Sequence, residues 1–375
     1  MISYVEIIGK YNLKLFALIE PSECWFELSY YELGEFQIYA PANSTNIQAL
    51  KMGNYAKIPH KPYLWVIKSV EYTFNASGSR MISAKGYEAK WLIGQRIIYN
   101  PFDLPTELKK AVYKLVANNL GDPALCDQQG SANFWAGGAN SYRYIPNFKP
   151  EKPTFDITIP QTQATRGNLW EFLANLLKTN KCGSYSSFID GKIVYKAIFG
   201  VDRSNYILFS QSMDNLISST YYENSEQKKT YCQVVSTFNE NDQEKTYIEQ
   251  YPDTEEIHPT SGIDRHEITI QSNISTKYTD AQGEEQEVAP TSDLYKGWQR
   301  QEGKNSLAEK ILQREFNADI DLKLSQYKFE EDFFIGDLVK VRDEFFGYEA
   351  SARIIKYTIK QDAGGYGEEA EYQTE

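Results

Sequence analysis

The chain of 375 residues is longer than a single hydrophobic core usually fills, so we expect two or more domains. Hydrophobic residues at 41%, aromatic residues at 14% and 28 tyrosines exclude a disordered chain and favour β-rich structure. The formal net charge of −12 argues against a protein that holds nucleic acid through a basic surface, and it suits a conduit along which phosphates slide.

Residues 4–98 alternate short β-type runs with turn signals, a spacing that predicts a barrel or sandwich of about seven strands. The stretch ASGSR, residues 76–80, predicts a hairpin turn within this series. The series ends in GYEAKWLIGQRII, residues 86–98, which reads as a strand that runs into a tight apolar turn and exposes Arg96.

The hydrophobic period changes after this series and predicts a helix that starts near Pro105 and ends at Gly121. Its apolar face comprises Leu108, Val112, Leu115 and Val116. Residues 121–152 then form an unusually long loop, and loops of this length are commonly functional or interfacial. The loop carries several aromatic residues, namely Phe134, Trp135, Tyr142 and Tyr144, so an interface is favoured over a sugar-binding platform.

A strand at TFDITIP, residues 154–160, precedes a second predicted helix at residues 167–183, with Asn168 as its N-cap and Gly183 closing it. Its apolar face is predicted to be core: Leu169, Phe172, Leu173, Leu176 and Leu177. Asp190 and Gly191 predict a hairpin between the strands that follow.

Residues 236–304 are polar and acidic and contain one clear alternating strand, HEITIQSNI. A third helix is predicted from the capping box SLAE, Ser306 to Glu309. It would carry an apolar face of Leu307, Ile311, Leu312 and Phe316. The remaining residues return to strands.

Residue types that carry chemistry are scattered along the chain. The four cysteines are far apart and predict buried free thiols: Cys24, Cys126, Cys182 and Cys232. The three histidines, His60, His258 and His266, lack the spacing of a zinc hydrolase. We therefore assign no catalytic, cofactor-binding or metal-ligating residues, and we expect neither enzyme activity nor a cofactor.

The stretch GVDRSN, residues 200–205, looks most like a motif, and it allows a structural and a catalytic interpretation. In the structural one, Asp202 accepts backbone amides within a turn and Arg203 pairs across domains. This interpretation is favoured over a catalytic one. The N-terminus predicts no secretory signal, and no apolar stretch reaches the ~20 residues of a membrane span.

Five stretches in this order and spacing resemble the tail hub family of siphophages: GEFQIYAP, VIKSVEYTF, GYEAKWLIGQRII, residues 200–235 and FFIGDLVKVRD. This family comprises the amino-terminal modules of tail-associated lysins, or Gp37-like siphovirus tail proteins. The resemblance extends over nearly the whole chain and is greatest to the small hub of a lactococcal phage baseplate.

The resemblance implies a mainly β, α+β fold similar to myophage baseplate hubs and type VI spike hubs, with two β-barrel-like tube domains. Residues 1–100 would form the first barrel, and residues 191–235 with 318–375 the second. Residues 101–190 would form an α+β domain with two helices, and residues 236–317 an inserted polar segment and helix packed against it. Relatives often carry an added lytic domain, and none is expected here because the chain ends at Glu375.

The function that the resemblance implies is a structural hub at the virion tail tip, synthesised in the host cytoplasm. A homotrimer would cap the tail tube, dock on the distal tail protein ring and gate the passage of phage DNA without binding it specifically. Receptor-binding proteins and the tape measure protein are further candidate partners.

The alternative function is that of a cell-wall-degrading or glycan-binding tail protein. In the hub, Gly94 would permit the turn at the barrel exit and Arg96 would anchor a neighbouring domain or chain, so Gly94→Val should disturb the trimer.

Overall fold

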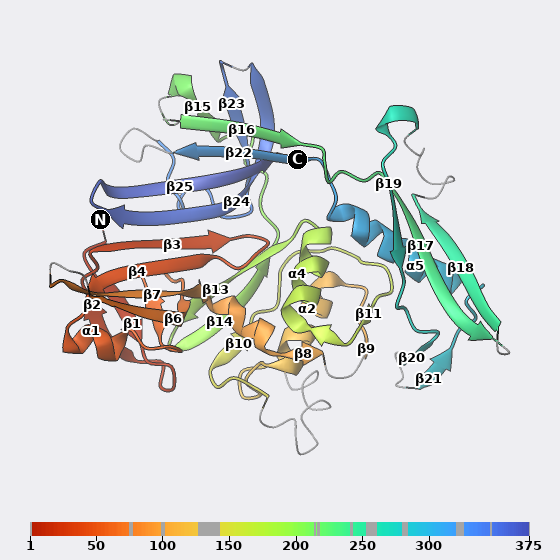
Figure 1. Cartoon of the computed structure of the whole chain (residues 1–375), viewed down its shortest axis with the longest axis horizontal. Helices are drawn as coiled ribbons and strands as arrows, with labels where there is room; N and C mark the ends of the chain where they lie inside the picture. Colours follow the sequence, from red (N-terminus) through yellow and green to blue (C-terminus); the bar gives the residue numbers. More distant parts are fainter. Residues whose placement is uncertain are drawn as a thin grey trace.

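The computed structural model describes residues 2–74, 78–98, 102–126, 143–213, 215, 218–240, 243–252, 261–279, 284–319, 326–345 and 347–374. Figure 1 shows a broad sheet region that contains the first and last strands, helices beside it, and a strand-and-helix unit at the far end of the molecule. Among the described residues, no helix combines the length and the hydropathy that a membrane-spanning segment needs.

The first part of the chain is a series of antiparallel strands. Its elements are β1 (Val5–Ile8), β2 (Leu15–Ile19), β3 (Glu23–Ser29), β4 (Glu35–Pro41), helix α1 (Ser44–Ala49), β5 (Tyr55–Lys57), β6 (Trp65–Phe74), β7 (Arg80–Glu88) and the 3₁₀ helix η1 (Ala89–Gln95). Apolar and polar residues alternate along these strands, so that one face of the sheet is buried. In β3 the apolar Cys24, Phe26 and Leu28 are buried, and the residues between them are less buried. Pairing of β6 with β7 out to Phe74 and Arg80 confirms the predicted hairpin, although residues 75–77 lie outside the described part.

The last part of the chain extends the same sheet. Its elements are β15 (Leu208–Ser210), the 3₁₀ helix η3 (Gln211–Met213), β16 (Ser218–Asn224), β22 (Gln313–Asp319), β23 (Leu338–Asp343), β24 (Tyr348–Asp362) and β25 (Gly365–Thr374). The strand β24 pairs antiparallel with β3, so both ends of the chain contribute to one 13-stranded sheet. Its main path runs β16-β22-β25-β24-β3-β4-β7-β6-β5-β1-β2.

This topology corrects the expectation of two separate barrels. Within the described residues the strand pairing follows an open path, with β2 at one end and β16 at the other, and no closed barrel is formed. The physical reason is the length of β24: its first six residues pair with β23, and the same edge continues beyond β23, so that residues 356–361 supply a partner for β3.

A single hydrophobic core lies under both halves of this sheet. Phe26 and Trp65 from the first half and Phe329 and Tyr357 from the second belong to it. The rings of Phe329 and Tyr357 stack with centroids 3.6 Å apart, and such aromatic burial is a large stabilising contribution. We therefore expect the two halves to unfold together.

The middle of the chain builds an α/β part on a second core. Its elements are β8 (Ile97–Ile98), β9 (Phe102–Asp103), α2 (Leu108–Asn119), β10 (Phe148–Pro150), β11 (Gln163–Ala164), β12 (Gly167–Asn168), α4 (Leu169–Thr179), β13 (Gly183–Ile189) and β14 (Lys192–Ile198). Both predicted helices are confirmed, and the Asn168 side chain accepts the amides of Trp170 and Glu171 at 2.9 and 3.3 Å. The hairpin at Asp190 and Gly191 is also confirmed by the pairing of β13 with β14.

Three predictions for this middle part need correction. The second helix ends at Thr179, and the left-handed residue after it is Lys181, whereas Gly183 begins β13. Part of the predicted 121–152 loop forms β10, which pairs parallel with β14, and residues 127–142 of that loop lie outside the described part. The predicted strand at 154–160 forms only a bridge from Thr158 to Glu107, because its neighbour is a helix start that offers no ladder.

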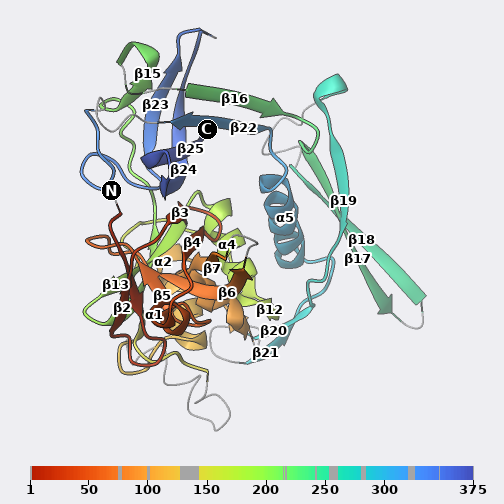
Figure 2. The same ribbon diagram turned by 60° about the vertical axis from the view of Figure 1, so that its left-hand side comes forward.

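The far unit packs one helix on a small sheet (Figure 2). Its elements are β17 (Tyr231–Glu240), β18 (Gln243–Tyr251), the 3₁₀ helix η4 (Gly262–Asp264), β19 (Glu267–Gln271), β20 (Lys277–Thr279), β21 (Glu285–Glu287) and α5 (Asp293–Ala308). Strand β17 lies between β18 and β19. Tyr295, Gln299 and Gly303, spaced four apart, form the buried stripe of α5.

The predicted third helix was misplaced. The helix is α5, capped by Ser292, whose hydroxyl oxygen accepts the Tyr295 amide at 3.2 Å, and it ends where the prediction begins. Residues from Gln313 onward form β22, because β16 and β25 pair with this strand on both sides. The helical spacing of Leu307, Ile311 and Leu312 was coincidental. The sequence also missed strands β17 and β18, which the polar composition of this region concealed.

Candidate functional site: junction and outer surfaces of the large sheet

A buried ion pair lies inside the stretch GYEAKW. Glu88 ends β7 and Lys90 lies in η1, and both side chains are almost fully buried with their charged atoms 2.9 Å apart. The Glu88 carboxylate also accepts the amides of Gly34 at 2.9 Å and Ser29 at 3.2 Å. Lys90 donates to the carbonyls of Ser29 and, at 2.8 Å, Ser184. The pair thus links β7, the β3–β4 turn and β13.

Burial disfavours the charged forms of both Glu88 and Lys90. Burial raises the pKa of Glu88, and the adjacent Lys90 and the two backbone amides oppose that rise. Burial likewise lowers the pKa of Lys90, and Glu88 opposes that fall. Because each charge depends on its partner, we expect the loss of either member to destabilise the elements that the pair joins.

The two residues that sequence reasoning singled out in this stretch, Gly94 and Arg96, act within the chain. A Cβ at Gly94 would lie 3.4 Å from the Cβ of Trp170, so this glycine allows η1 to approach the first turn of α4. Arg96 is half-buried and donates from Nε to the Arg143 carbonyl at 2.7 Å. Arg96 was expected to anchor a neighbouring domain or a neighbouring chain. In the structure it contacts Arg143, in the segment of the same chain that follows the first 100 residues.

A second junction is built around Tyr30, directly after β3. Its ring is flanked by Gly183 and Gly336, where any Cβ would clash with the ring. Its hydroxyl accepts the Gly200 amide at 3.2 Å and lies within hydrogen-bond distance of the Lys181 and Ile198 carbonyls. This one side chain therefore connects the first sheet half, the α/β part and the last third of the chain.

The predicted turn GVDRSN forms the neighbouring contact, and the predicted role of Asp202 in the turn is confirmed. Asp202 accepts the Ser204 amide at 2.9 Å. Arg203 pairs with Asp337 at 2.7 Å, and the same carboxylate accepts the Val201 amide at 2.8 Å. Arg203 and Asp337 lie within the same predicted tube domain. From the sequence, Arg203 was expected to pair across two domains, and this ion pair does not do so.

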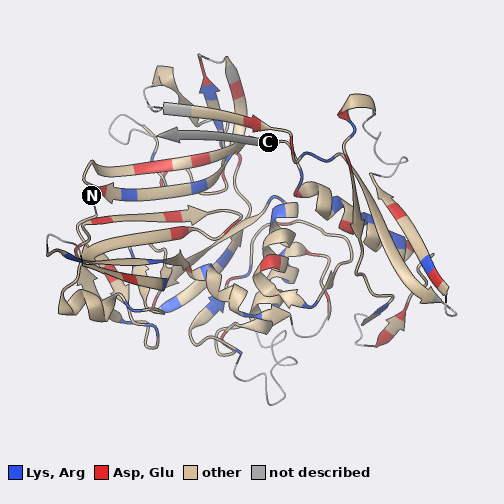
Figure 3. Ribbon diagram, viewed as in Figure 1, with Lys and Arg blue, Asp and Glu red and all other residues tan. Residues whose placement is uncertain are grey.

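The outer face of the sheet is polar where its two halves join. Lys356 of β24 lies 3.3 Å from the Glu371 carboxylate of β25 and 3.9 Å from that of Glu27 in β3. Figure 3 shows the acidic positions of β25 beside the basic positions of β24. Burial raises the pKa of Glu27 to about 7, an effect that Lys356 opposes and Glu371 and Glu88 reinforce. This face therefore carries alternating charges in place of a basic patch.

The strand β2 is an apolar edge of the sheet. It pairs only with β1 among the described strands, so its other edge is open for pairing. Phe16 and Leu18, two residues apart on the same side of the strand, are 55% and 53% exposed. They lie next to the Glu6–Lys57 ion pair, whose atoms are 2.8 Å apart. An exposed edge with apolar side chains is typical of a site that pairs with another chain.

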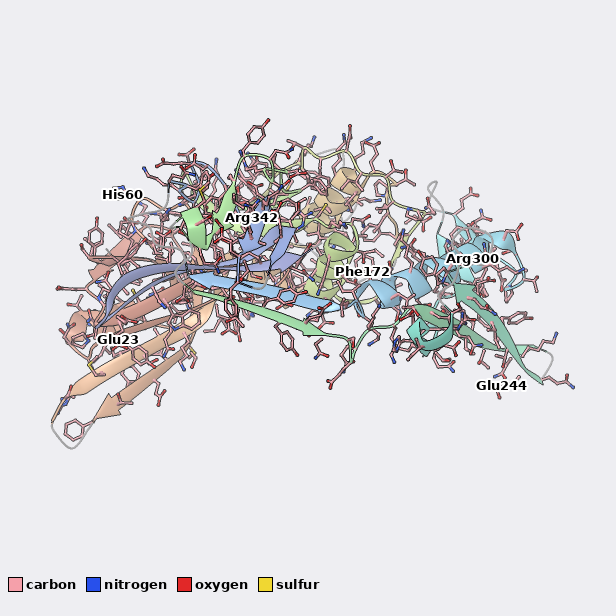
Figure 4. The ribbon with its side chains drawn as sticks, turned by 90° about the horizontal axis from the view of Figure 1, so that it is seen from above. Glu23, His60, Phe172, Glu244, Arg300 and Arg342 are labelled. Atoms are coloured by element: carbon pink, nitrogen blue, oxygen red, sulfur yellow. The ribbon has the colours of Figure 1, made fainter. Side chains whose placement is uncertain are left out.

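The hairpin of β6 and β7 is a second protruding element. Figure 4 shows it extending away from the rest of the sheet. Tyr72 and Phe74, near its end, are 55% and 69% exposed, and the Arg80 guanidinium lies 5.6 Å from the centroid of the Phe74 ring. Exposed aromatic residues with an arginine are typical of interface hot spots.

The cysteines and histidines, which could act in catalysis or metal binding, form no common site among the described residues. The four cysteines are free and buried, as predicted. Burial raises the pKa of the Cys182 thiol to about 12. His60 is exposed in a turn, His266 is exposed, and His258 lies outside the described residues. No group of three metal-ligating side chains is found in the part of the chain that the structure describes.

Sequence reasoning missed the Glu88–Lys90 pair, Tyr30 and the exposed face of β2. The sequence did contain a signal for the exposed face of β2. In LKLFALI, apolar residues occupy both odd and even positions, so a strand with one buried face must expose some of them. For Glu88 and Lys90 nothing local distinguished them from surface charges, since their burial depends on segments far away in the sequence.

The fold is that of known tail proteins. The structure matches "the tail protein from Neisseria meningitidis MC58" with a TM-score of 0.58 at 11% identity, covering 99% of this chain and 96% of that one. It matches the 43 kDa tail protein of prophage MuSo2 from Shewanella oneidensis with a TM-score of 0.55 at 12% identity, covering 98% of both chains. A weaker likeness, with a TM-score of 0.45, is to an E. coli component of the type VI secretion system, and a score of this size does not establish a common fold.

A family model described as the siphovirus ReqiPepy6 Gp37-like protein matches residues 15–371. The chain therefore belongs to this family of siphovirus Gp37-like proteins, which confirms the coarser part of the resemblance stated above. No curated protein matches the sequence.

Proposed function

We propose that this protein is the structural hub of a siphophage tail tip. Three copies would form a ring that caps the tail tube, docks on the distal tail protein and gates the passage of DNA. Membership of the siphovirus Gp37-like family and a fold shared with two tail proteins support this assignment. Its location would then be the tail of the virion.

The observation that carries the proposal is the single sheet shared by the two ends of the chain. Because β3 pairs with β24 over one core, each chain presents two adjacent sheet halves as one rigid wall. Three such walls give six sheet halves, which suits docking on a sixfold ring. Residues 1–100 would supply one tube-lining half, and residues 191–235 with 318–375 the other.

The polar outer face of this wall would line the passage. Its charges alternate in sign, so Lys356 offsets Glu27 and Glu371 and gives phosphate groups no strong attraction. The overall charge of −12 opposes lasting binding of nucleic acid further. DNA would slide along such a wall without specific contacts.

The open edge of β2 would supply contacts between copies. Phe16 and Leu18 expose apolar surface on a strand that pairs with β1 on one edge and with no described strand on the other. A heterologous contact at this edge, repeated three times, would close a ring. The α/β part, residues 101–190, and the inserted segment, 236–317, would lie distal to the tube. The gate would be a change in the packing of these distal parts.

The first experiment is a measurement of mass in solution by light scattering coupled to gel filtration. The hub predicts a particle of three times the 43.1 kDa chain mass, alone or with the distal tail protein. A strict monomer at high concentration, unchanged by addition of the distal tail protein, would contradict the proposal.

A further inference from the structure

A cavity of about 420 Å³ lies between the α/β part and the far unit, and the hub function makes no use of it. One wall is the loop at 161–165 with Phe172 and Asn175 of α4. The other is the face of α5 that carries Trp298, Gln301, Glu302 and Asn305. Figure 4 shows Phe172 between the ribbons of α4 and α5. A volume of this size is in the range of small-molecule sites.

We propose that this cavity binds a neutral pyranose unit of a glycan. The proposal stands on the lining residues and does not depend on the hub assignment.

The polar groups of the cavity are uncharged amides and hydroxyls together with two glutamates. Amides come from both walls: Asn175 on one side, Gln301 and Asn305 on the other. The Gln301 side chain donates to Asn305 at 2.8 Å, which fixes the orientation of both groups. An amide offers a donor and an acceptor next to each other, and this suits the neighbouring hydroxyls of a sugar ring.

The charge of the lining excludes other ligand classes. Among the described residues that line the cavity there is neither lysine nor arginine. A phosphate-containing polymer or a nucleic acid would therefore meet Glu302 and Glu309 with no compensating cation. The remaining lining includes Trp298 and Phe172, whose ring surfaces can cover the apolar C–H face of a pyranose.

Glu302 supplies an independent reason to expect a hydrogen-bond donor in the cavity. Its Oε2 atom is buried and has no hydrogen-bond partner among the described residues, although Ser272 forms a hydrogen bond with the same carboxyl group. Burial raises the pKa of this carboxyl group. A buried acceptor without a partner is costly, and a sugar hydroxyl would satisfy it.

The test uses the purified full-length protein and saturation-transfer NMR with a panel of neutral disaccharides, among them cellobiose, chitobiose and galactobiose, at millimolar concentration. A glycerol-phosphate polymer is the anionic probe. We expect saturation transfer to at least one neutral disaccharide and none to the polymer. Asn175→Ala and Gln301→Ala should each weaken binding about tenfold, the effect of one lost hydrogen bond.

Two further variants locate the site. Lys304→Ala changes an exposed residue of the same helix outside the cavity and should leave binding unchanged. Trp135→Ala tests the long loop, which would bind instead if that segment were a sugar platform. The proposal is overturned by no transfer to any disaccharide in the folded protein, by binding of the polymer alone, or by binding that depends on Trp135 and is indifferent to both cavity variants.

Discussion

At the scale of single residues, the buried Glu88–Lys90 pair has the largest expected effect on stability. Glu88→Gln would leave the Lys90 ammonium buried without a countercharge, and we expect a loss of about 3–5 kcal/mol in the free energy of unfolding. Urea denaturation followed by tryptophan fluorescence measures it.

A control for this prediction is the Glu6–Lys57 pair on the same sheet, whose side chains are 23% and 15% exposed. Lys57→Met should cost less than about 1 kcal/mol, because solvent screens this pair. Equal losses in the two variants would show that burial does not determine the contribution of Glu88.

Glu27 should make stability depend on pH. Its folded pKa of about 7 lies above its ordinary value of 4.5, so the folded state binds more protons between these values and stability falls as pH rises through this window. The substitution Glu27→Gln removes this pH-dependent contribution to stability, because glutamine does not titrate. The variant should be more stable than the parent at pH 8, by at most about 3 kcal/mol, and equally stable at pH 4.

Thermal denaturation of both proteins from pH 4 to pH 8 checks the prediction for Glu27. Parallel curves across the whole range would rule out a raised pKa at this position. Comparing the variant with its parent cancels the contribution of the other carboxyl groups.

At the scale of elements, the contact of α5 with β17 depends on a glycine. A Cβ at Gly303 would lie 3.0 Å from the Tyr251 Cβ and 3.1 Å from Val234, so Gly303→Val should force the helix away from the sheet. We expect a loss of about 1–3 kcal/mol, the usual cost of overpacking. Local hydrogen exchange in β17 and α5 should rise.

Gly297, in the same helix, is the control for the variant at Gly303. A side chain there meets open space, so Gly297→Ala should stabilise the helix by up to about 1 kcal/mol. If both variants destabilised the unit alike, the close contact at Gly303 would not be the cause.

The sequence predicted elements well where local signals and tertiary packing agree. The helix capped by Asn168 and the hairpin at Asp190 and Gly191 are both present, because a cap and a turn are determined by neighbouring residues. The third helix failed because its residues, Gln313 onward, become a strand through pairing with β16 and β25. A local pattern cannot report a partner that lies elsewhere in the chain.

At the scale of the whole molecule, the β2 edge should control assembly and leave the fold intact. Phe16→Asp with Leu18→Asp changes two exposed side chains, so the variant should remain folded with an unchanged melting temperature. It should run as a monomer under conditions in which the parent forms trimers, since charges on an edge strand oppose pairing. A double variant that still formed trimers would remove β2 from the interface.

The joining of the two sheet halves could not be predicted from the sequence. The residues that form it, such as Leu28 opposite Tyr357, lie near the two ends of the chain, and each half alone reads as a complete series of strands. The polar outer face depends on this union, because Glu27 and Lys356 come together only where β3 and β24 pair. The family resemblance supplied the general class of fold, and the structure was needed for its topology.

In the proposed hub, three copies enclose a passage with the outer face of this sheet as its wall. Electron microscopy of the purified assembly, with a resolution sufficient to place the strands, tests it most directly. A hub requires a threefold ring with a central bore, and with Glu27, Lys356 and Glu371 facing that bore. A particle without a bore, or one in which this face is turned to the outside, would contradict it.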